Sequence, residues 1–476
     1  MEPAAGATLN SMNARGLCSV VRLVALGVIA TLPSPAAGQT VEVPPNLILP
    51  NYDRIPVGQR EGIEAGAYVA RTDDAAANWF NPAGLAKSAQ TTLAAAATAY
   101  EWTSLELDGF GTSAGRSRIS SIGTLVSVVI GEGTIRSDQW RLGFSITRPI
   151  VWQPSTIDIA FPLQAGSELV GYTSDVGFDV MIPGVAVAFA PGGVTSGKFR
   201  IGAGLGLAIT TLTQEQTISD RVTTATTASV ARRDFSADGS VWHLQPTGGV
   251  QWDPTPRFKL GARVVAPSLR VHGSSALRLE NSRFTVGDLS DLVFRDSTVE
   301  FDYRFPFQAT VGAAVILGGG GAVELDVHYY GAIDPYAMYA STVPGRLTTQ
   351  TGGSLTVTTP PFTTTTNSAR SVVNVAIGGH HPLSKALGVH AGFSTDQSPV
   401  DDQAQSIFRK VNLSRVTAGM SLTGTSLSGS LGLGYSFGSG TRQTLGSTVG
   451  GQVTETQLKV RTVNVLFALS YAFHSP

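Results

Sequence analysis

Apolar and polar side chains alternate with a period of two along most of the chain. In the C-terminal segment the apolar face consists of Val463, Val465, Phe467, Leu469, Tyr471 and Phe473. The same alternation recurs at 201–209, 307–317 and 427–437. Successive side chains of a β-strand point to opposite faces, so a period of two predicts strands and not helices. We therefore expect an all-β protein whose strands each carry one apolar face.

The alternation predicts about fourteen strands, which are joined by connections of two kinds. The predicted strands are 90–103, 117–130, 136–149, 179–190, 198–215, 240–252, 257–271, 298–317, 322–331, 369–380, 385–395, 412–423, 427–437 and 458–473. Connections after even-numbered strands are short and rich in Gly, Pro and Asp, the residues of tight turns. Connections after odd-numbered strands are long, from roughly 13 to roughly 37 residues, and this sorting is typical of a transmembrane barrel.

The composition agrees with a surface that contacts lipid. Only 14% of the residues are charged, against about 25% in an average soluble domain. The net charge of −1 provides no positive field for a polyanion, which excludes nucleic-acid binding. A soluble sandwich would also have no reason to sort its connections by length. We therefore predict a transmembrane antiparallel β-barrel that spans 90–476 and contacts outer-membrane lipid.

Residues 1–38 are predicted to be a signal peptide. Basic residues precede an apolar run at 23–32, and small residues follow at 36–38, which is the order found in secretory signals. The single cysteine, Cys18, lies within this segment. The mature chain is therefore expected to begin near Gln39 and to lack cysteine, which excludes disulfides and thiol chemistry. Beyond the signal, no run of about 18 apolar residues could form a transmembrane helix.

Residues 39–89 lack the alternation, so they are not part of the predicted wall. They contain the sequence GAYVARTDDAAANWFNPAGLA at 66–86. The pattern within it consists of Asp73, Asp74, Trp79, Phe80, Asn81, Pro82, Ala83 and Gly84. Pro82 disfavours helical backbone at Asn81 and should end a short helix there. The pattern resembles the N-terminal hatch signature of the FadL-type outer-membrane transporters of long-chain fatty acids.

The resemblance implies a location and a mechanism. Residues 39–89 would fold into the lumen as a hatch, or plug, that must shift to let substrate through. The protein would take up hydrophobic compounds passively, foremost long-chain fatty acids or else hydrocarbons, across the outer membrane of a Gram-negative bacterium. Helical outer loops would form a low-affinity groove, and a deeper site would contact the hatch. Lateral release would occur beside an inward kink of the third strand, where Gly143 could permit the bend. We expect a monomer without a cofactor.

Two long connections, 150–178 and 272–297, are unusually apolar for loops in water, and contiguous apolar surface usually marks binding. The candidate substrate-binding residues within them are Trp152, Ile157, Phe161, Leu163, Leu289 and Phe294. A hydrophobic molecule would first contact the protein there.

Strand parity directs several cations into the predicted lumen. They are Arg141, Arg200, Lys259, Arg263, Arg304 and Arg415. Arg141 and Arg263 are candidates for binding a fatty-acid carboxylate. The alternative is that these cations form ion pairs with the lumen acids Asp302, Glu324 and Asp326, and so fill a polar lumen.

Other functions have weaker support. A general diffusion porin or a structural barrel is the first alternative, and the hatch motif and the apolar connections argue against it. A lipase or esterase would need Ser113 of the GTSAG sequence at 111–115, but that sequence lies in a loop between strands and not at a strand-to-helix turn. Glu324, Asp326 and His328 share one strand face, but no second histidine is near them in sequence, so we predict no metal site.

Overall fold

The computed structural model describes residues 40–473 apart from 45, 47, 109–118, 132–136, 153–156, 165–167, 194–196, 224–227, 402–406, 441–442 and 448–452. The chain divides into two units, Met1–Gln39 and Thr40–Pro476. The predicted signal peptide and Ser113 therefore lie outside the described residues.

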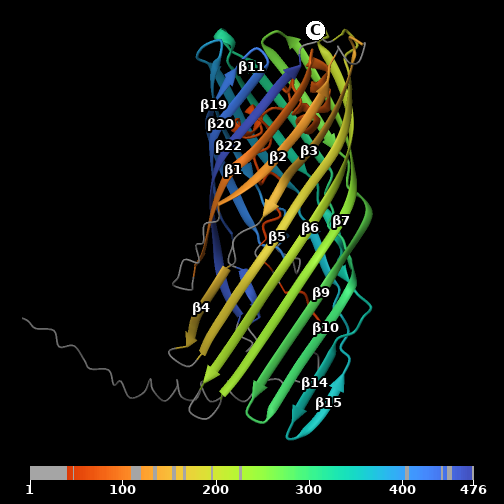
Figure 1. Ribbon diagram of the computed structural model, residues 1–476, viewed down its shortest axis with the longest axis vertical. Coiled ribbons are helices and arrows are strands. Elements are labelled where there is room, and N and C mark those ends of the chain that lie inside the picture. Colours follow the sequence, from red (N-terminus) through yellow and green to blue (C-terminus); the bar gives the residue numbers. More distant parts are fainter. Residues whose placement is uncertain are drawn as a thin grey trace, which may run out of the picture. The chain divides into compact units, whose positions relative to one another are not determined.

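The second unit is a closed antiparallel barrel of fourteen strands (Figure 1). In ring order these are β1 (Thr91–Asp108), β2 (Ile119–Ile130), β3 (Trp140–Trp152), β5 (Glu168–Phe189), β6 (Phe199–Thr223), β7 (Ala228–Thr255), β8 (Phe258–Val265), β11 (Gln308–Ile316), β12 (Ala322–Tyr330), β17 (Val372–Pro382), β18 (Leu387–Asp396), β19 (Val411–Thr423), β20 (Leu427–Gly440) and β22 (Val453–Phe473). Each strand pairs with the next, and β22 pairs with β1 to close the ring. Each predicted strand corresponds to one of these, which confirms the predicted fold class.

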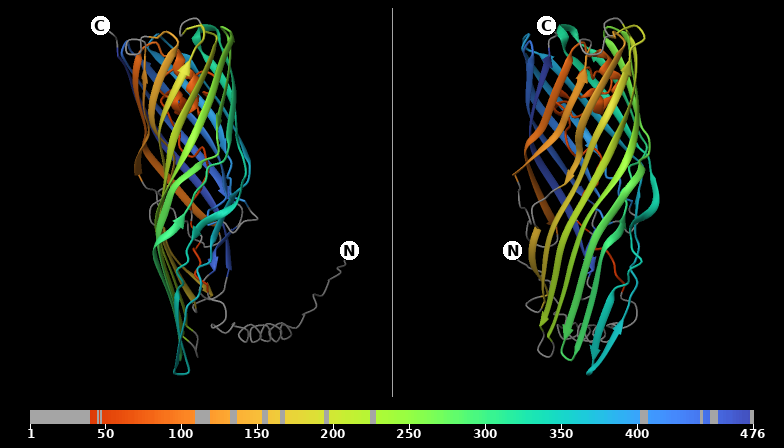
Figure 2. Two further views of the ribbon diagram at one scale, coloured as in Figure 1. Left: turned by 90° about the vertical axis from the view of Figure 1, so that its right-hand side faces the viewer. Right: turned by 45° about the vertical axis from the view of Figure 1, so that its right-hand side comes forward.

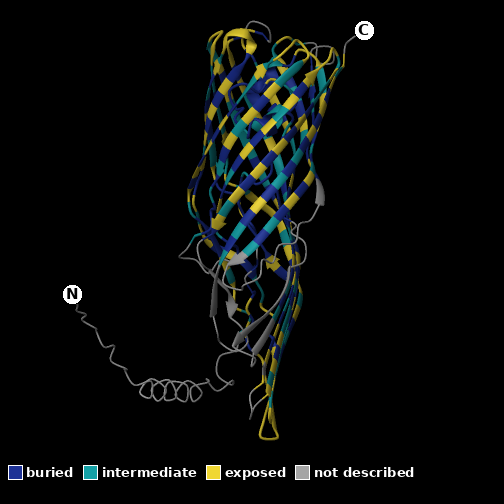
Figure 3. Cartoon of the chain, turned by 90° about the vertical axis from the view of Figure 1, so that its left-hand side faces the viewer, coloured by how far each residue is buried: buried dark blue, intermediate teal, exposed yellow. Residues whose placement is uncertain are grey.

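Near the short turns, the wall is apolar outside and polar or small inside. In β3 the side chains of Phe144 and Ile146 are exposed, whereas those of Arg141 and Thr147 are buried. Figure 3 shows buried and exposed positions alternating along the strands. An apolar outer surface around a polar lumen is the arrangement of bacterial outer-membrane barrels, and it is the reverse of a soluble sandwich.

Several strands continue far beyond the roughly 10 residues that a tilted membrane crossing needs. β5, β6 and β7 have 22, 25 and 28 residues and extend the wall at the end with the long connections, which is the lower end in Figure 1. The additional strands are β4 (Ile157–Gln164), β9 (Leu269–Thr285), β10 (Asp288–Phe301), β13 (Ile333–Ala340), β14 (Arg346–Thr351), β15 (Ser354–Thr358), β16 (Thr365–Ala369) and β21 (Gln443–Ser447). In this extension many of the buried side chains are apolar, as Phe178, Leu212 and Leu279 illustrate, although polar ones such as Gln214 and Gln216 are buried among them.

The extension corrects the predicted loops. Where the sequence predicts loops at 150–178 and 272–297, the structure has β4 with part of β5, and the hairpin of β9 and β10. The described residues of these connections contain no helix, so the helical outer loops implied by the resemblance are wrong there. The apolar alternation continues past the membrane, and the residues pair with neighbouring strands instead of leaving the wall.

Two predicted strands are longer than the strands in the structure. Proline has no backbone N–H to donate to a neighbouring strand. β8 therefore ends before Pro267, and β11 begins after Pro306.

The hatch lies inside the barrel, toward the upper end in Figure 2. It contains α2 (Arg60–Ile63), α3 (Ala77–Phe80) and the 3₁₀ helix η2 (Pro82–Lys87). A further 3₁₀ helix, η3 (Gly318–Gly320), forms a short turn of the wall. Before α2, the hatch runs through the lumen toward the opposite end, where Val41 forms a bridge with Phe362.

Among the described residues, no helix has the length and apolar character needed to cross a membrane.

Candidate functional site

Asn81 attaches the hatch to the wall. Pro82 begins η2 and leaves Asn81 in extended backbone, so the α3 helix ends there. The Asn81 side-chain nitrogen donates to the Val69 carbonyl within the hatch at 2.9 Å. It also donates to the carbonyls of Val250 in β7 at 2.9 Å and Ala262 in β8 at 3.3 Å. One buried amide therefore joins two parts of the hatch to two strands of the barrel.

Glycines in the wall allow backbone and side-chain atoms of the hatch to approach closely. A Cβ atom at Gly249 would lie 2.0 Å from the Asn81 side-chain oxygen, and one at Gly261 would lie 2.4 Å from the Val69 carbonyl oxygen. Gly143 has the same role, because its Cβ would lie 2.2 Å from the side-chain oxygen of Asn78. Any larger residue at these positions would push the hatch away from the wall.

Charged groups form a second attachment, which we call the Arg71 cluster: Glu64 and Arg71 of the hatch with Glu324 of β12. Arg71 binds Glu64 at 2.5 Å and Glu324 at 2.6 Å, and all three side chains are almost fully buried. Next to it, Asp326 accepts hydrogen bonds from the backbone nitrogens of Tyr68 and Val69 at 2.8 and 3.0 Å. Burial alone would raise the pKa of Glu64, but hydrogen bonds from histidines and the charge of Arg71 hold that pKa below its usual value.

The wall is incomplete between β2 and β3. Their pairing runs from Ile130↔Leu142 to Leu125↔Thr147 and stops there, although β3 continues to Trp152. The register of β3 against β5 also shifts after Thr147, around Pro149, which lacks a donor. The backbone nitrogen of Ile55, in the hatch, donates instead to the Pro149 carbonyl at 3.2 Å.

The side chain of Ile55 fills this gap. It packs in a buried cluster with Ile122 of β2 and Val151 of β3. The hatch thus supplies the apolar contact that a neighbouring strand would otherwise make. The resemblance implies an opening beside a kink at Gly143, but Gly143 is regularly paired with both Val129 and Ala186. The irregular position is Pro149, so the proposed role of Gly143 as a kink is wrong.

A cavity of about 90 Å³ lies between the hatch and the wall. Its apolar lining includes Ile55, Trp79, Phe80, Ile150 and Ile182. Its polar lining includes Arg263, Gln308, Thr310 and His328. The Arg263 guanidinium lies over the Trp79 ring, 4.9 Å from its centroid. No carboxylate of the described residues lies within ion-pairing distance of Arg263.

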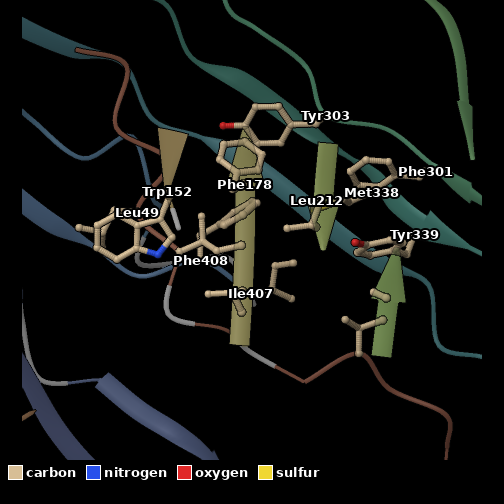
Figure 4. Close-up of a cluster of buried hydrophobic side chains, with 14 of the residues drawn as sticks. Leu49, Trp152, Phe178, Leu212, Phe301, Tyr303, Met338, Tyr339, Ile407 and Phe408 are labelled. Carbon is tan, nitrogen blue, oxygen red and sulfur yellow. The ribbon is translucent and has the colours of Figure 1, made fainter. Parts of the chain in front are cut away.

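Toward the long-connection end, the lumen is filled by apolar side chains, which we call the outer cluster (Figure 4). Its labelled members are Leu49, Trp152, Phe178, Leu212, Phe301, Tyr303, Met338, Tyr339, Ile407 and Phe408. Aromatic rings pack edge-to-face within it, with Phe178 and Tyr303 centroids 4.9 Å apart and Tyr303 and Phe408 centroids 5.8 Å apart. The outer cluster reaches the cavity, because Ile150 and Ile182 belong to both.

Comparison with solved structures finds the same architecture. A FadL homologue of Pseudomonas aeruginosa matches with a TM-score of 0.56 and 13% identity, covering 89% of this chain and 100% of that one. The toluene transporter TodX of Pseudomonas putida matches with a TM-score of 0.52 and 14% identity, covering 92% and 100%. The toluene transporter TbuX of Ralstonia pickettii matches with a TM-score of 0.52 and 14% identity, covering 89% and 100%.

The fold is that of the FadL-type outer-membrane channels of Gram-negative bacteria. The solved structures named above are transport channels and not enzymes. No protein-family model and no curated protein sequence matches the chain. The FadL-type fold accounts for the ring of fourteen strands and for the short helices within it.

The FadL-type barrel holds the predicted cations in different surroundings. Arg141 donates to the Ser88 carbonyl at 2.7 Å, so it holds the end of the hatch. Arg200 pairs with Asp253 at 2.9 Å and Arg304 with Asp302 at 2.8 Å. Arg415 lines the cavity but donates to the Asp53 carbonyl at 2.9 Å. The ion-pair alternative thus describes Arg304, whose partner Asp302 is one of the predicted acids; Arg200 pairs with a different acid, and Arg263 faces the cavity.

The predicted apolar residues are spread along the extension. Trp152 belongs to the outer cluster, and Phe294 is buried against Phe362 with ring centroids 5.1 Å apart. Leu289 lies near the tip of the β9–β10 hairpin, opposite Phe284. Ile157, Phe161 and Leu163 belong to β4, and their side chains lie outside the described residues.

The residues of the hatch motif likewise lie in different surroundings. Asn81, Pro82, Ala83 and Gly84 contact the wall or the hatch interior; a Cβ at Gly84 would lie 2.4 Å from the Thr72 carbonyl oxygen. Trp79 and Phe80 line the cavity. Asp73 and Asp74 pair instead with Arg60, at 3.3 and 3.5 Å. Sequence reasoning missed Glu64, Arg71 and the wall glycines, because nothing in their spacing shows that the hatch contacts them.

Hatch attachment should weaken as the pH rises, because of Glu61. Burial, and the neighbouring Asp74, raise the pKa of Glu61 from 4.5 to about 8. A raised pKa means that the folded hatch binds this proton more tightly than the unfolded chain, so stability falls as the pH rises from about 5 to about 8. After the intrinsic base-catalysed rise of the exchange rate with pH is subtracted, the protection of hatch amides should fall over that range by up to about tenfold per pH unit. Glu61→Gln should remove most of this slope; an unchanged slope would contradict the assignment.

Proposed function

We propose that this protein takes up long-chain fatty acids passively across the outer membrane. Substrate enters at the long-connection end, crosses the apolar lumen, binds in the cavity beside the hatch and leaves through the wall between β2 and β3. The hatch must shift for the last step, because Ile55 occupies that gap.

The observation that carries this proposal is that the cavity adjoins the gap. Ile55 and Pro149, which form the hatch-to-wall hydrogen bond at the gap, also line the cavity. A molecule in the cavity would therefore leave sideways, into the apolar layer of the membrane, once Ile55 moved. This route spares a hydrophobic molecule from crossing water, where its apolar surface would cost about 25 cal/mol per Å².

The lining of the cavity favours a carboxylate-bearing lipid over a plain hydrocarbon. Arg263 is a cation over the Trp79 ring, and no carboxylate of the described residues pairs with it at ion-pair distance. Gln308, Thr310 and His328 supply further polar atoms in the same cavity. An aromatic hydrocarbon would offer the Arg263 guanidinium no anionic partner, whereas a fatty-acid headgroup would supply one; Thr310 and His328 already hydrogen-bond each other at 3.2 Å.

Arg263→Gln tests the substrate class. A charge-assisted hydrogen bond contributes about 1.5–3 kcal/mol, so oleate binding to the purified protein should weaken about tenfold to a hundredfold. Binding of an uncharged ligand of similar size, such as an aliphatic alcohol, should change little. Both affinities are measured by isothermal titration in detergent.

Arg304→Gln is the matched control, because Arg304 also faces the lumen but pairs with Asp302 and lies outside the cavity. It should bind oleate as the unmodified protein does. Equal loss in both variants, or no preference of the unmodified protein for oleate over the alcohol, would contradict the fatty-acid proposal and favour a hydrocarbon substrate.

A general diffusion porin has less support. The hatch and the outer cluster occupy the lumen along its length, so hydrophilic solutes would meet buried apolar side chains. The esterase alternative depends on Ser113, which lies outside the described residues.

A further inference from the structure

Two histidines and a glutamate converge where the hatch meets β17 and β18. The Nδ1 atom of His390 lies 2.7 Å from Glu64 Oε1, and the Nδ1 atom of His380 lies 3.5 Å from the same oxygen. All three potential ligand atoms lie within 4.8 Å of one another. We propose that Glu64, His380 and His390 bind a divalent transition metal ion, such as Zn²⁺, which links the hatch to the barrel wall.

The strand register explains how the three side chains meet. His380 and His390 are direct cross-strand partners, and so are Gly378 and Gly392. Side chains two residues apart on a strand face the same side, so both pairs face the lumen. A Cβ at Gly378 would lie 2.2 Å from the Glu64 carbonyl oxygen, and one at Gly392 would lie 2.5 Å from its carbonyl carbon. The glycine pair therefore places Glu64 against the wall, with its carboxylate beside the histidine pair.

The donor set suits zinc. Two imidazoles and a carboxylate are the protein ligands of many zinc sites that keep a fourth position for water. Tetrahedral Zn²⁺ holds its ligand atoms roughly 3.3 Å apart at bond lengths of roughly 2.0 Å, so small side-chain rotations would complete the site. His390 Nε2 lies 2.7 Å from Ser421 Oγ. Such a hydrogen bond on the far ring nitrogen orients a metal-binding histidine.

Charge also favours a cation. The Arg71 cluster contains two carboxylates and one guanidinium. Arg71 donates a hydrogen bond to Glu64 Oε2, and the other carboxylate oxygen, Oε1, faces the histidines. Arg71 also lies 3.2 Å from His380 Nδ1, and metal binding would require it to leave that atom. Its two carboxylate partners would remain. The His380 side chain is 24% exposed, which provides a path for the ion.

The experiment measures zinc directly and does not depend on the transported substrate. The purified full-length protein, without an affinity tag, is stripped with chelator, dialysed against Zn²⁺ and analysed by mass spectrometry of the metal. We expect one Zn²⁺ per chain, and a loss of affinity of at least about a hundredfold in His390→Ala and in Glu64→Gln. The matched control is His381→Ala, since His381 is next in sequence but lies on the exposed side of β17. It should bind zinc normally.

A second measurement uses the unmodified protein, so it does not depend on whether a variant folds. Zn²⁺ should slow carbethoxylation of His380 by at least about tenfold and leave that of His381 unchanged, as read by peptide mass spectrometry. Absence of stoichiometric zinc, equal affinity in the control and ligand variants, or equal protection of both histidines would each overturn the proposal.

Discussion

Joining the hatch to the wall at the gap should stop uptake. In the double variant Ile55→Cys with Val151→Cys, oxidation of the pair is expected to reduce fatty-acid uptake into proteoliposomes to the level of empty vesicles. The two side chains share a buried cluster beside the cavity, so a covalent bond would prevent Ile55 from leaving the wall opening. A reductant should restore uptake, because it breaks only this bond. The single cysteine of the chain, Cys18, lies in the predicted signal peptide and should not interfere.

The control is a disulfide that joins two wall strands and leaves the hatch free. Ala391 of β18 and Ala418 of β19 are cross-strand partners, and both side chains are exposed. The variant Ala391→Cys with Ala418→Cys should transport equally well when oxidised and when reduced. If the oxidised Ile55 and Val151 variant still transported at the reduced rate, substrate would have to leave by another route.

Replacing Asn81 should release the hatch and turn the barrel into a leaky pore. Asn81→Ala removes four side-chain hydrogen bonds, two within the hatch and two to wall carbonyls. At about 1 kcal/mol each, their loss would destabilise the attached hatch by about 4 kcal/mol, and the buried carbonyls left without donors add to that cost. We expect ion conductance in planar bilayers to rise severalfold, together with faster proteolysis of the hatch.

Two further variants separate hatch attachment from general stability. Gly249→Ala places a Cβ against the Asn81 side chain from the wall side, so it should reproduce the leak. Asn464→Ala alters another fully buried asparagine, which belongs to β22 of the wall. Its side chain makes no hydrogen bond to the described residues of the hatch. It should leave conductance low. Equal conductance in all variants and the unmodified protein would show that Asn81 does not hold the hatch closed.

The sequence predicted the wall well, because each strand contacts lipid directly. The outward face of a strand must be apolar whatever its neighbours are, so the period of two is visible in segments such as Val463–Phe473 without knowledge of the pairing. The order of short and long connections likewise follows from topology alone. The predicted lengths were less accurate. Alternation does not reveal where the membrane ends, and the same pattern continues through β5 and β9 into the extension.

The sequence predicted the residues of the site only where they lie together in one short segment. The motif from Asp73 to Gly84 is contiguous, and Asn81 acts partly on its own neighbours, because its side-chain oxygen accepts a hydrogen bond from the Ala83 backbone nitrogen at the start of η2. Arg263 was one of six cations predicted to face the lumen, and only the position of the hatch shows that it lines the cavity. From the sequence, Gly143 could permit a kink in the third strand, but the irregular pairing lies at Pro149; a strand glycine and a strand proline both suggest irregular pairing, and only the register distinguishes them.

By itself, the sequence determined that this chain forms an antiparallel barrel with a polar lumen and a separate N-terminal segment, because these features depend on periodicity and local backbone chemistry. Only the tertiary structure decided which wall residues contact the hatch, where the wall opens, and that Glu64 meets His380 and His390. The contacts of Glu64 join residues more than 300 positions apart, and all of these contacts depend on strand register, which no local pattern encodes.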